Sequence, residues 1–277
     1  MNITLRCRDR LLRLEQPVVM AIINITSDSF YASHGMLSEG ELVETVAKAI
    51  EEGASIIDVG AVSTRPQSHA IASAEEISRI DFAVKLLRKH FPEVVISVDT
   101  YRAVVAEVAV ANGADMINDV SGGTLDEEMF ATVGRLGVPY VLTHMQGTPL
   151  TMQSFTQYDD LLTELLSFFE ERIRALHTFG VNDIILDPGF GFAKTMEQNY
   201  ELLSKLGHFN CLNLPLLVGV SHKSMLYKFL DIEAQDALNA TTVAHTIALL
   251  KGAHILRVHE VRPAMEAIKI VEEINRH

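Results

Sequence analysis

The sequence lacks several features that would assign it to other protein classes. Among its 277 residues only Cys7 and Cys211 are cysteines, with no C-x-x-C spacing, and the longest early apolar run, Pro17–Ile25, is too short to span a bilayer. These absences argue against a disulfide scaffold, a zinc cluster, a membrane partner and a signal peptide. We therefore expect a soluble, cytoplasmic protein with two lone, buried thiols.

Positive charge is also scarce. The chain has 23 Lys and Arg against 36 Asp and Glu, a formal net charge of −13. Nucleic-acid binding needs a basic face, so this balance argues against a nucleic-acid partner. Many acids lie in pairs on expected helices, as at Glu51-Glu52 and Glu75-Glu76, which predicts that the negative charge lies on the outside.

One pattern occurs eight times along the chain. A short apolar run rich in β-branched residues ends in a polar residue, and a loop and a stretch with helical spacing follow. Continuous apolar strands alternating with helices are typical of parallel strands buried on both faces. The expected strands are Val18–Asn24, Ser55–Gly60, Val94–Asp99, Asp115–Asp119, Pro139–Met145, Asp183–Pro188, Leu214–Ser221 and His254–His259. Helical spacing is found at Glu41–Glu52, Ala74–His90, Arg102–Asn112, Asp159–Phe179 and Thr241–Lys251.

Eight such units in a chain of this length favour an α/β fold, a single (β/α)₈ TIM barrel formed by residues 1–277 as one domain. Neither a G-x-G-x-x-G after the first strand nor a P-loop motif occurs, which weakens the open doubly wound alternatives. Gly53, Gly113 and Gly252 each lie between a helix and a strand and predict left-handed helix caps. Residues 1–16 alternate in polarity and predict an N-terminal hairpin that plugs the barrel bottom.

Polar residues stand at the expected strand ends, where such a barrel builds its active site. They are Asn24, Asp58, Asp99, Asn118, His144, Asp187, Lys223, Arg257 and His259. Burying this set unpaired would be costly, so we interpret it as a binding site, although Asp58 and His144 taken singly fit a structural role equally well.

The residue types indicate what this site binds. Carboxylates and an amide at Asp99, Asn118 and Asp187 suit a flat heterocycle with N–H donors and a carbonyl acceptor, and Lys223 adds a cation. Arg257 and His259 are two residues apart, point to the same side of their strand and form a phosphate clamp. An ion pair between Arg257 and a helix carboxylate is the alternative.

Two long polar loops, Asn24–Gly40 and Ser63–Ser68, are typical of lids over a substrate, with ordinary surface connections as the alternative. In the segment Asp187–Phe192, two glycines allow close backbone approach to a ligand, and Phe192 offers an apolar wall.

In this order, the segments closely resemble dihydropteroate synthase, the folate-pathway enzyme and sulfonamide target. The resemblance runs from about Val18 to Val261. Its motifs are Asn24–Phe30, Ile56–Pro66, Ser97–Thr100, Ile117–Gly122, His144–Gly147, Asp187–Lys194, Ser221–Ser224 and Arg257–His259. It implies a Mg²⁺-dependent transferase, usually a homodimer, that joins p-aminobenzoate to 7,8-dihydropterin-6-ylmethyl diphosphate and releases pyrophosphate.

The resemblance also implies residue roles. Asp187, Lys223, Arg257 and His259 would carry catalysis. The pterin would be held by Asp99, Asn118, Met145, Asp187, Gly219 and Lys223. The diphosphate would be bound by Asn24, Thr64, Arg257 and His259, with Asn24 as the Mg²⁺ ligand. The p-aminobenzoate would contact Phe30, Thr64, Arg65, Pro66, Phe192 and Ser224.

The sequence departs from the family pattern at several positions. Ser27 replaces a proline, Ala61 and Gln67 replace glycines, and Val62, His222 and Glu260 replace a glutamate, an arginine and an aspartate. An imidazole need not be charged near pH 7, so a permanent cation near the p-aminobenzoate end is lost at His222. Two alternatives therefore stay open: a non-catalytic or weakened pterin-binding paralogue, and a pterin-binding methyltransferase domain. Arg257 and His259 argue against the second, which needs no diphosphate clamp.

Overall fold

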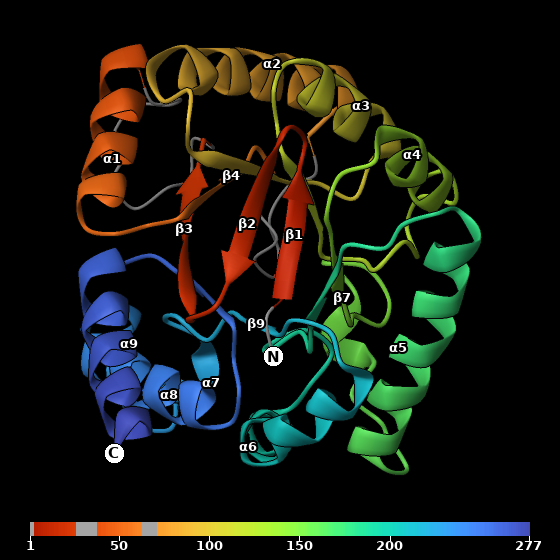
Figure 1. Cartoon of the computed structure of the whole chain (residues 1–277). Coiled ribbons are helices and arrows are strands. Elements are labelled where there is room, and N and C mark those ends of the chain that lie inside the picture. The colour runs from red at the N-terminus through yellow and green to blue at the C-terminus, as the bar shows by residue number, and fades with distance from the viewer. Residues whose placement is uncertain (1–2, 26–37, 63–70) are drawn as a thin grey trace.

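A ring of parallel strands forms the centre of the protein (Figure 1). The computed structural model describes residues 3–25, 38–62 and 71–277. Neighbouring strands follow the order β8-β7-β6-β5-β4-β3-β10-β9, and a parallel bridge between Leu186 and Leu216 links the two ends of this sheet. The strands are β3 (Val18–Asn24), β4 (Ile56–Gly60), β5 (Val95–Asp99), β6 (Met116–Asp119), β7 (Tyr140–Thr143), β8 (Ile184–Asp187), β9 (Leu217–Val218) and β10 (Ile255–Val258). The expected eight-stranded barrel is confirmed.

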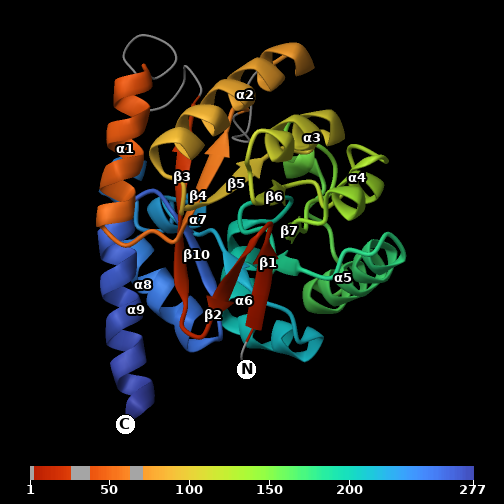
Figure 2. The same ribbon diagram turned by 45° about the horizontal axis from the view of Figure 1, so that its top comes forward.

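Helices surround the strands on the outside (Figure 2). They are α1 (Glu39–Glu51), α2 (Ser73–His90), α3 (Ala103–Ala111), α4 (Met129–Leu136), α5 (Leu161–Thr178), α6 (Met196–Lys205), α7 (Ser224–Tyr227), α8 (Leu238–Leu250) and α9 (Val261–Arg276). Short 3₁₀ helices lie at Met152–Ser154 (η1), Leu206–Leu212 (η2) and Ala234–Asp236 (η3). Apolar side chains of the helices and the outward side chains of the strands form one large core. Gly53, Gly113 and Gly252 have φ values of +110°, +114° and +96°, so each has the predicted positive φ after a helix.

The barrel interior has an apolar layer near the start of the strands. One side chain from each strand joins a buried cluster: Met20, Ile56, Val95, Met116, Val141, Ile185, Leu217 and Ile255. Because side chains of a strand alternate between its faces, the residue two positions further on also points inward. At those positions stand Asp58, Asn118, Asp187 and Arg257 among others, so a polar layer lies directly above the apolar one.

An antiparallel hairpin closes the apolar end of the barrel. Strands β1 (Ile3–Cys7) and β2 (Arg10–Leu14) pair from Ile3 with Leu14 to Cys7 with Arg10, and they lie across the barrel opening in Figure 1. Leu5, Cys7 and Leu14 are buried in the same cluster as the apolar layer. The predicted plug is therefore confirmed for the described part of the hairpin.

Three expectations about local structure were wrong. Strand β9 has only two residues rather than eight, and just before it Pro215 has no N–H while the N–H of Leu216 donates to Nδ1 of His254 at 3.2 Å. Cys211 is exposed, whereas Cys7 is buried as expected. Glu76 is fully buried, since Arg102 and the hydroxyl of Thr100 bind its carboxylate.

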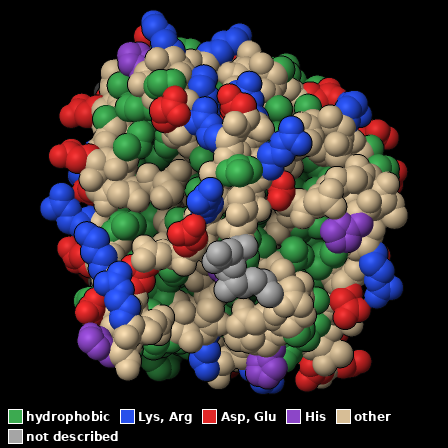
Figure 3. All heavy atoms as spheres, in the orientation of Figure 1, with side chains coloured by type: hydrophobic (Ala, Val, Ile, Leu, Met, Phe, Trp, Pro, Cys, Tyr) green, Lys and Arg blue, Asp and Glu red, His purple; other side chains and the backbone are tan. Residues whose placement is uncertain are grey.

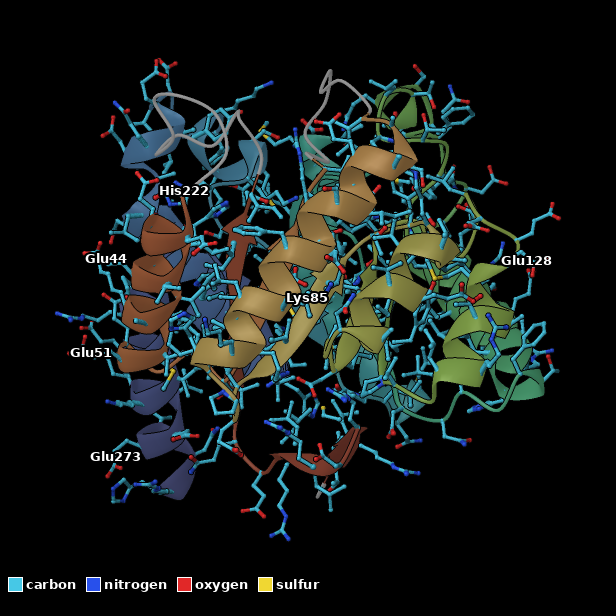
Figure 4. All side chains as sticks on the ribbon, turned by 90° about the horizontal axis from the view of Figure 1, so that it is seen from above. Glu44, Glu51, Lys85, Glu128, His222 and Glu273 are labelled. Atoms are coloured by element: carbon cyan, nitrogen blue, oxygen red, sulfur yellow. The ribbon has the colours of Figure 1, made fainter. Side chains whose placement is uncertain are left out.

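The outer surface carries charge of both signs. Figure 3 shows acidic and basic side chains distributed around the rim of the hairpin end. Figure 4 shows Glu44, Glu51, Glu128 and Glu273 on the helices at the periphery, away from the barrel interior. Within the described residues, we find no helix with the length and apolarity that a bilayer crossing requires.

The plug predicts that two leucines of the hairpin contribute very differently to the free energy of unfolding. Leu5 is 2% exposed and Leu11 is 61% exposed. Leu5→Ala should lower the free energy of unfolding by about 2–5 kcal/mol, because it leaves a cavity against the apolar layer. Leu11→Ala should change it by less than about 0.5 kcal/mol. Urea denaturation followed by circular dichroism measures both, and equal losses would contradict the plug.

Candidate active site

The polar layer is organised around one partly buried arginine, Arg257, whose side chain is 18% exposed. Nε of Arg257 on β10 donates to Oδ2 of Asp58 on β4 at 2.7 Å, and a terminal nitrogen donates to Oδ2 of Asp99 on β5 at 2.7 Å. Nδ2 of Asn118 on β6 donates to the same Asp58 oxygen at 2.9 Å. We call Asp58, Asp99, Asn118 and Arg257 the arginine cluster. The alternative expectation, an ion pair between Arg257 and a helix carboxylate, is wrong, because both acids that bind Arg257 lie on strands.

The carboxylates of Asp58 and Asp99 share Arg257 as the cation of this cluster, and burial shifts the pKa of Asp99 and of Arg257. Desolvation raises the pKa of Asp99 to about 7, although Arg257 opposes this, and the neighbouring Asp58 raises it further. Burial disfavours the charge on Arg257, yet the attraction of Asp58 and Asp99 raises its pKa above the usual value. The cluster therefore holds a permanent cation and a carboxyl group that titrates near neutral pH.

Asp187 lies at the end of β8, beside a loop that only glycine permits. Its Oδ1 accepts a hydrogen bond from the backbone N–H of Gly189 at 2.8 Å. Gly189 has a φ of +72°, and a Cβ there would lie 2.1 Å from the carbonyl oxygen of His144. Burial raises the pKa of Asp187, while the Gly189 N–H and Lys223 lower it.

Lys194 is a buried residue to which sequence reasoning assigned no role. Its Nζ lies 3.1 Å from Nδ1 of His144 and donates to the carbonyl oxygens of Gly189 and Phe192, each at 3.1 Å. Burial lowers its pKa to about 7, although Asp187 opposes the shift. Lys194 thus holds the loop 189–193 against β7. The only sequence signal was its position at the end of the Asp187–Lys194 motif.

Lys223 and Phe192 form the side wall of the site. Nζ of Lys223 lies 4.4 Å from the centroid of the Phe192 ring, a cation–π contact. Phe192 is buried in a small cluster with Met145 and Met152, so the expected apolar wall is present. Ser224 is the first residue of α7 and follows Lys223 directly.

His259 lies just after β10, and Ser221 fixes its ring. Nδ1 of His259 lies 3.0 Å from Oγ of Ser221, and the same oxygen accepts the backbone N–H of His259 at 3.3 Å. A serine hydroxyl can donate one hydrogen bond and accept two, so it can also donate to Nδ1 of His259. In that tautomer Nε2 carries the proton and can donate to an anionic oxygen.

Asn24 ends β3 and lies beside Gly60 at the end of β4. A Cβ on neighbouring Gly60 would lie 3.4 Å from Oδ1 of Asn24 and 3.6 Å from Cβ of Asp99, so the missing side chain leaves space beside the amide oxygen. Among the described residues, no three His, Cys, Asp or Glu side chains gather into a metal-binding group. Asn24 fits a hard cation that takes its other oxygen ligands from substrate or water.

Most of the predicted site residues meet at the barrel end opposite the hairpin. Gly219 follows β9 next to Arg257, since a Cβ there would lie 3.9 Å from Cβ of Arg257. Four predicted residues lie outside the described part of the chain: Phe30, Thr64, Arg65 and Pro66. Asp58, for which a site role was left open, proves to hold both Asn118 and Arg257.

The chain is similar to known proteins over nearly its whole length. The family described as pterin binding enzyme matches residues 20–259. Dihydropteroate synthase of Escherichia coli K12 is 40% identical over 267 residues, which cover 94% of this chain and 93% of the relative. That of Haemophilus influenzae is 36% identical, with 96% and 97% covered.

Solved structures agree. A Yersinia pestis dihydropteroate synthase in complex with a sulfonamide drug superposes with a TM-score of 0.94 at 36% identity, covering 99% of this chain and 100% of that one. A Xanthomonas albilineans dihydropteroate synthase with 4-aminobenzoic acid gives 0.91 at 33% identity, with 99% of both chains covered. The chain belongs to the dihydropteroate synthase family, which are transferases of folate synthesis. This argues against the methyltransferase alternative.

Proposed function

We propose that this chain joins p-aminobenzoate to 7,8-dihydropterin-6-ylmethyl diphosphate, forming 7,8-dihydropteroate and pyrophosphate. The observation that carries the proposal is the buried polar layer at the open barrel end, where carboxylates, an amide and two cations lie within one ring of strands. The likeness to the Xanthomonas albilineans structure with 4-aminobenzoic acid supports the second substrate.

The pterin suits the inner part of the site. Its N–H groups are donors, and the carboxylates of Asp99 and Asp187 and the amide oxygen of Asn118 are acceptors. Lys223 donates to the ring carbonyl, while the loop that Lys194 holds keeps Asp187 in place. Met145, which is 2% exposed, and Gly219 complete the apolar surroundings.

The diphosphate suits the outer part, where His259 offers an Nε2–H and Arg257 a charged guanidinium. We include Thr64 in this set by likeness to the family. A Mg²⁺ ion held by Asn24 and by diphosphate oxygens would neutralise charge on the leaving group.

The reaction needs no protein nucleophile. The bond between the pterin methylene carbon and the diphosphate oxygen breaks, and its electron pair leaves with pyrophosphate. The amine nitrogen of p-aminobenzoate forms the new C–N bond and loses one proton, which the released pyrophosphate takes up. Arg257 and His259 stabilise the charge on the leaving group, and the carboxylate of Asp187 stabilises positive charge on the pterin. Phe192 and Ser224 would border the p-aminobenzoate, with Phe30, Thr64, Arg65 and Pro66 closing over it. The sulfonamide in the Yersinia pestis structure supports competition by sulfonamides at this end.

Pyrophosphate release tests this function directly. Purified protein should release pyrophosphate only when p-aminobenzoate, the pterin diphosphate and Mg²⁺ are all present. Asp187→Ala should lower the rate by about 100-fold or more, since it removes a buried charge from the pterin site. Asp159→Ala, which changes an exposed acid, should leave it unchanged.

Two results would contradict the proposal. Pterin diphosphate binding in a calorimeter without any turnover would favour the non-catalytic paralogue, and a near-normal rate for Asp187→Ala would remove its role.

We also propose that the chain forms a homodimer through α8 and α9, which pack against each other. Large apolar side chains are exposed on both helices, at Val243 (52%), Leu250 (57%), Ile270 (62%) and Ile274 (59%). The two residues on α8 are seven positions apart and the two on α9 are four apart, so each pair lies on one face of its helix. Such a face suits a second copy of the chain.

Analytical ultracentrifugation tests the dimer. The wild type should sediment at twice the chain mass of 30.6 kDa, and Val243→Glu with Ile270→Glu should shift it to the monomer, because each charge would be buried unpaired. Leu11→Glu, on the hairpin, should leave the dimer intact. A monomeric wild type would refute this arrangement.

A further inference from the structure

Two departures from the family pattern meet in one contact. His222 follows β9 and Glu260 follows β10, yet Nε2 of His222 lies 2.9 Å from Oε2 of Glu260. Their side chains are 17% and 33% exposed, so the contact is partly shielded from water. The chain therefore differs from its family at both partners of a single pair.

The His222 ring is fixed at both nitrogens. Nδ1 lies 2.5 Å from the carbonyl oxygen of Ala234 in η3, and the backbone N–H of His222 donates to Oγ1 of Thr241 at 3.1 Å. A carbonyl oxygen and a carboxylate both accept hydrogen bonds, so both contacts are satisfied together when each ring nitrogen carries a proton. In that form the pair is a cation facing an anion.

This pair touches His259 from two sides. The rings of His222 and His259 pack edge to face, with centroids 5.7 Å apart and planes at 87°. Glu260 is the next residue after His259, and Ser221, which precedes His222, binds Nδ1 of His259. Figure 4 places His222 at the barrel end opposite the hairpin. The His259 ring is therefore in contact with His222 and is next in the chain to Glu260.

We propose that His222 and Glu260 act as a positioning pair for His259, and through it for the diphosphate group, in place of the arginine and aspartate usual in the family. Histidine reaches less far than arginine, while glutamate reaches one methylene further than aspartate. A shorter side chain at position 222 and a longer one at position 260 offset each other in length. This inference rests on the proposed function, because His259 is taken as a diphosphate ligand.

The compensation in length predicts how the two reversions combine. Glu260→Asp alone leaves a gap to His222, and His222→Arg alone forces a longer side chain against Glu260. Each single variant should displace His259, while the double variant restores a matched pair. If the two side chains acted independently, the fold-losses in pyrophosphate affinity of the single variants would multiply in the double variant.

Calorimetric titration with inorganic pyrophosphate and Mg²⁺ measures the pyrophosphate affinity of each variant without turnover. Each single variant should bind pyrophosphate about 5- to 20-fold more weakly than the wild type, and the double variant should lie within about threefold of it. The control is His90→Ala, which removes an exposed histidine at the end of α2 and should have no effect. In steady-state assays the single variants should raise the KM for the pterin diphosphate more than they lower kcat.

Two outcomes would contradict the proposed role of the His222–Glu260 pair. One is a double variant whose fold-loss in pyrophosphate affinity equals the product of the two single fold-losses. The other is a wild type that binds pyrophosphate no better than His259→Ala.

The two readouts also separate this proposal from the proposed function. Coupled pyrophosphate binding without formation of dihydropteroate would keep the pair and refute the function. Normal formation of dihydropteroate, together with independent effects of the two substitutions on pyrophosphate binding, would keep the function and refute the pair.

Discussion

The site depends on one partly buried guanidinium that two buried carboxylates share. Arg257 joins β10 to β4 through Asp58 and to β5 through Asp99, and Asp58 extends the cluster to Asn118 on β6. An uncompensated charge in this position would be strongly destabilising, so each member is required by the others. The geometry that a pterin would meet in the proposed site is therefore set by the barrel before any ligand binds, which is the preorganisation that electrostatic catalysis needs.

This polar cluster is possible because the barrel is closed beneath it. The hairpin and the eight apolar side chains of the lower layer fill the interior at one end, which leaves the inward positions above them facing the open end. The same alternation of side chains along each strand thus produces the packed core and the polar site. The glycine loop after β8, fixed by Lys194, adds the remaining wall.

Much of this arrangement could be predicted from the sequence. Strand β3 was expected at Val18–Asn24 and is found there, because apolar runs bounded by polar residues are a local signal. The meeting of Asp99, Asn118 and Arg257 at one barrel end followed from their positions at the ends of parallel strands. Their partners did not follow, since the Asp58–Arg257 bond joins residues 199 positions apart and depends on ring closure. The short β9, the buried Glu76 and the role of Lys194 were missed for a related reason: each depends on a partner that lies far away in the sequence or that a local pattern does not reveal.

The shared guanidinium is tested most directly by the pH dependence of 7,8-dihydropterin binding. Burial raises the pKa of Asp99 to about 7, above its usual 3.8, so Asp99 is a proton-free acceptor only above that range. Affinity for the pterin should therefore rise between pH 6 and 8, with a midpoint near 7. Asp58→Asn removes the neighbouring negative charge that raises the pKa of Asp99, so its midpoint should move to lower pH. An affinity that does not change across this range, or the same midpoint in both proteins, would contradict the shared guanidinium as the basis of the site.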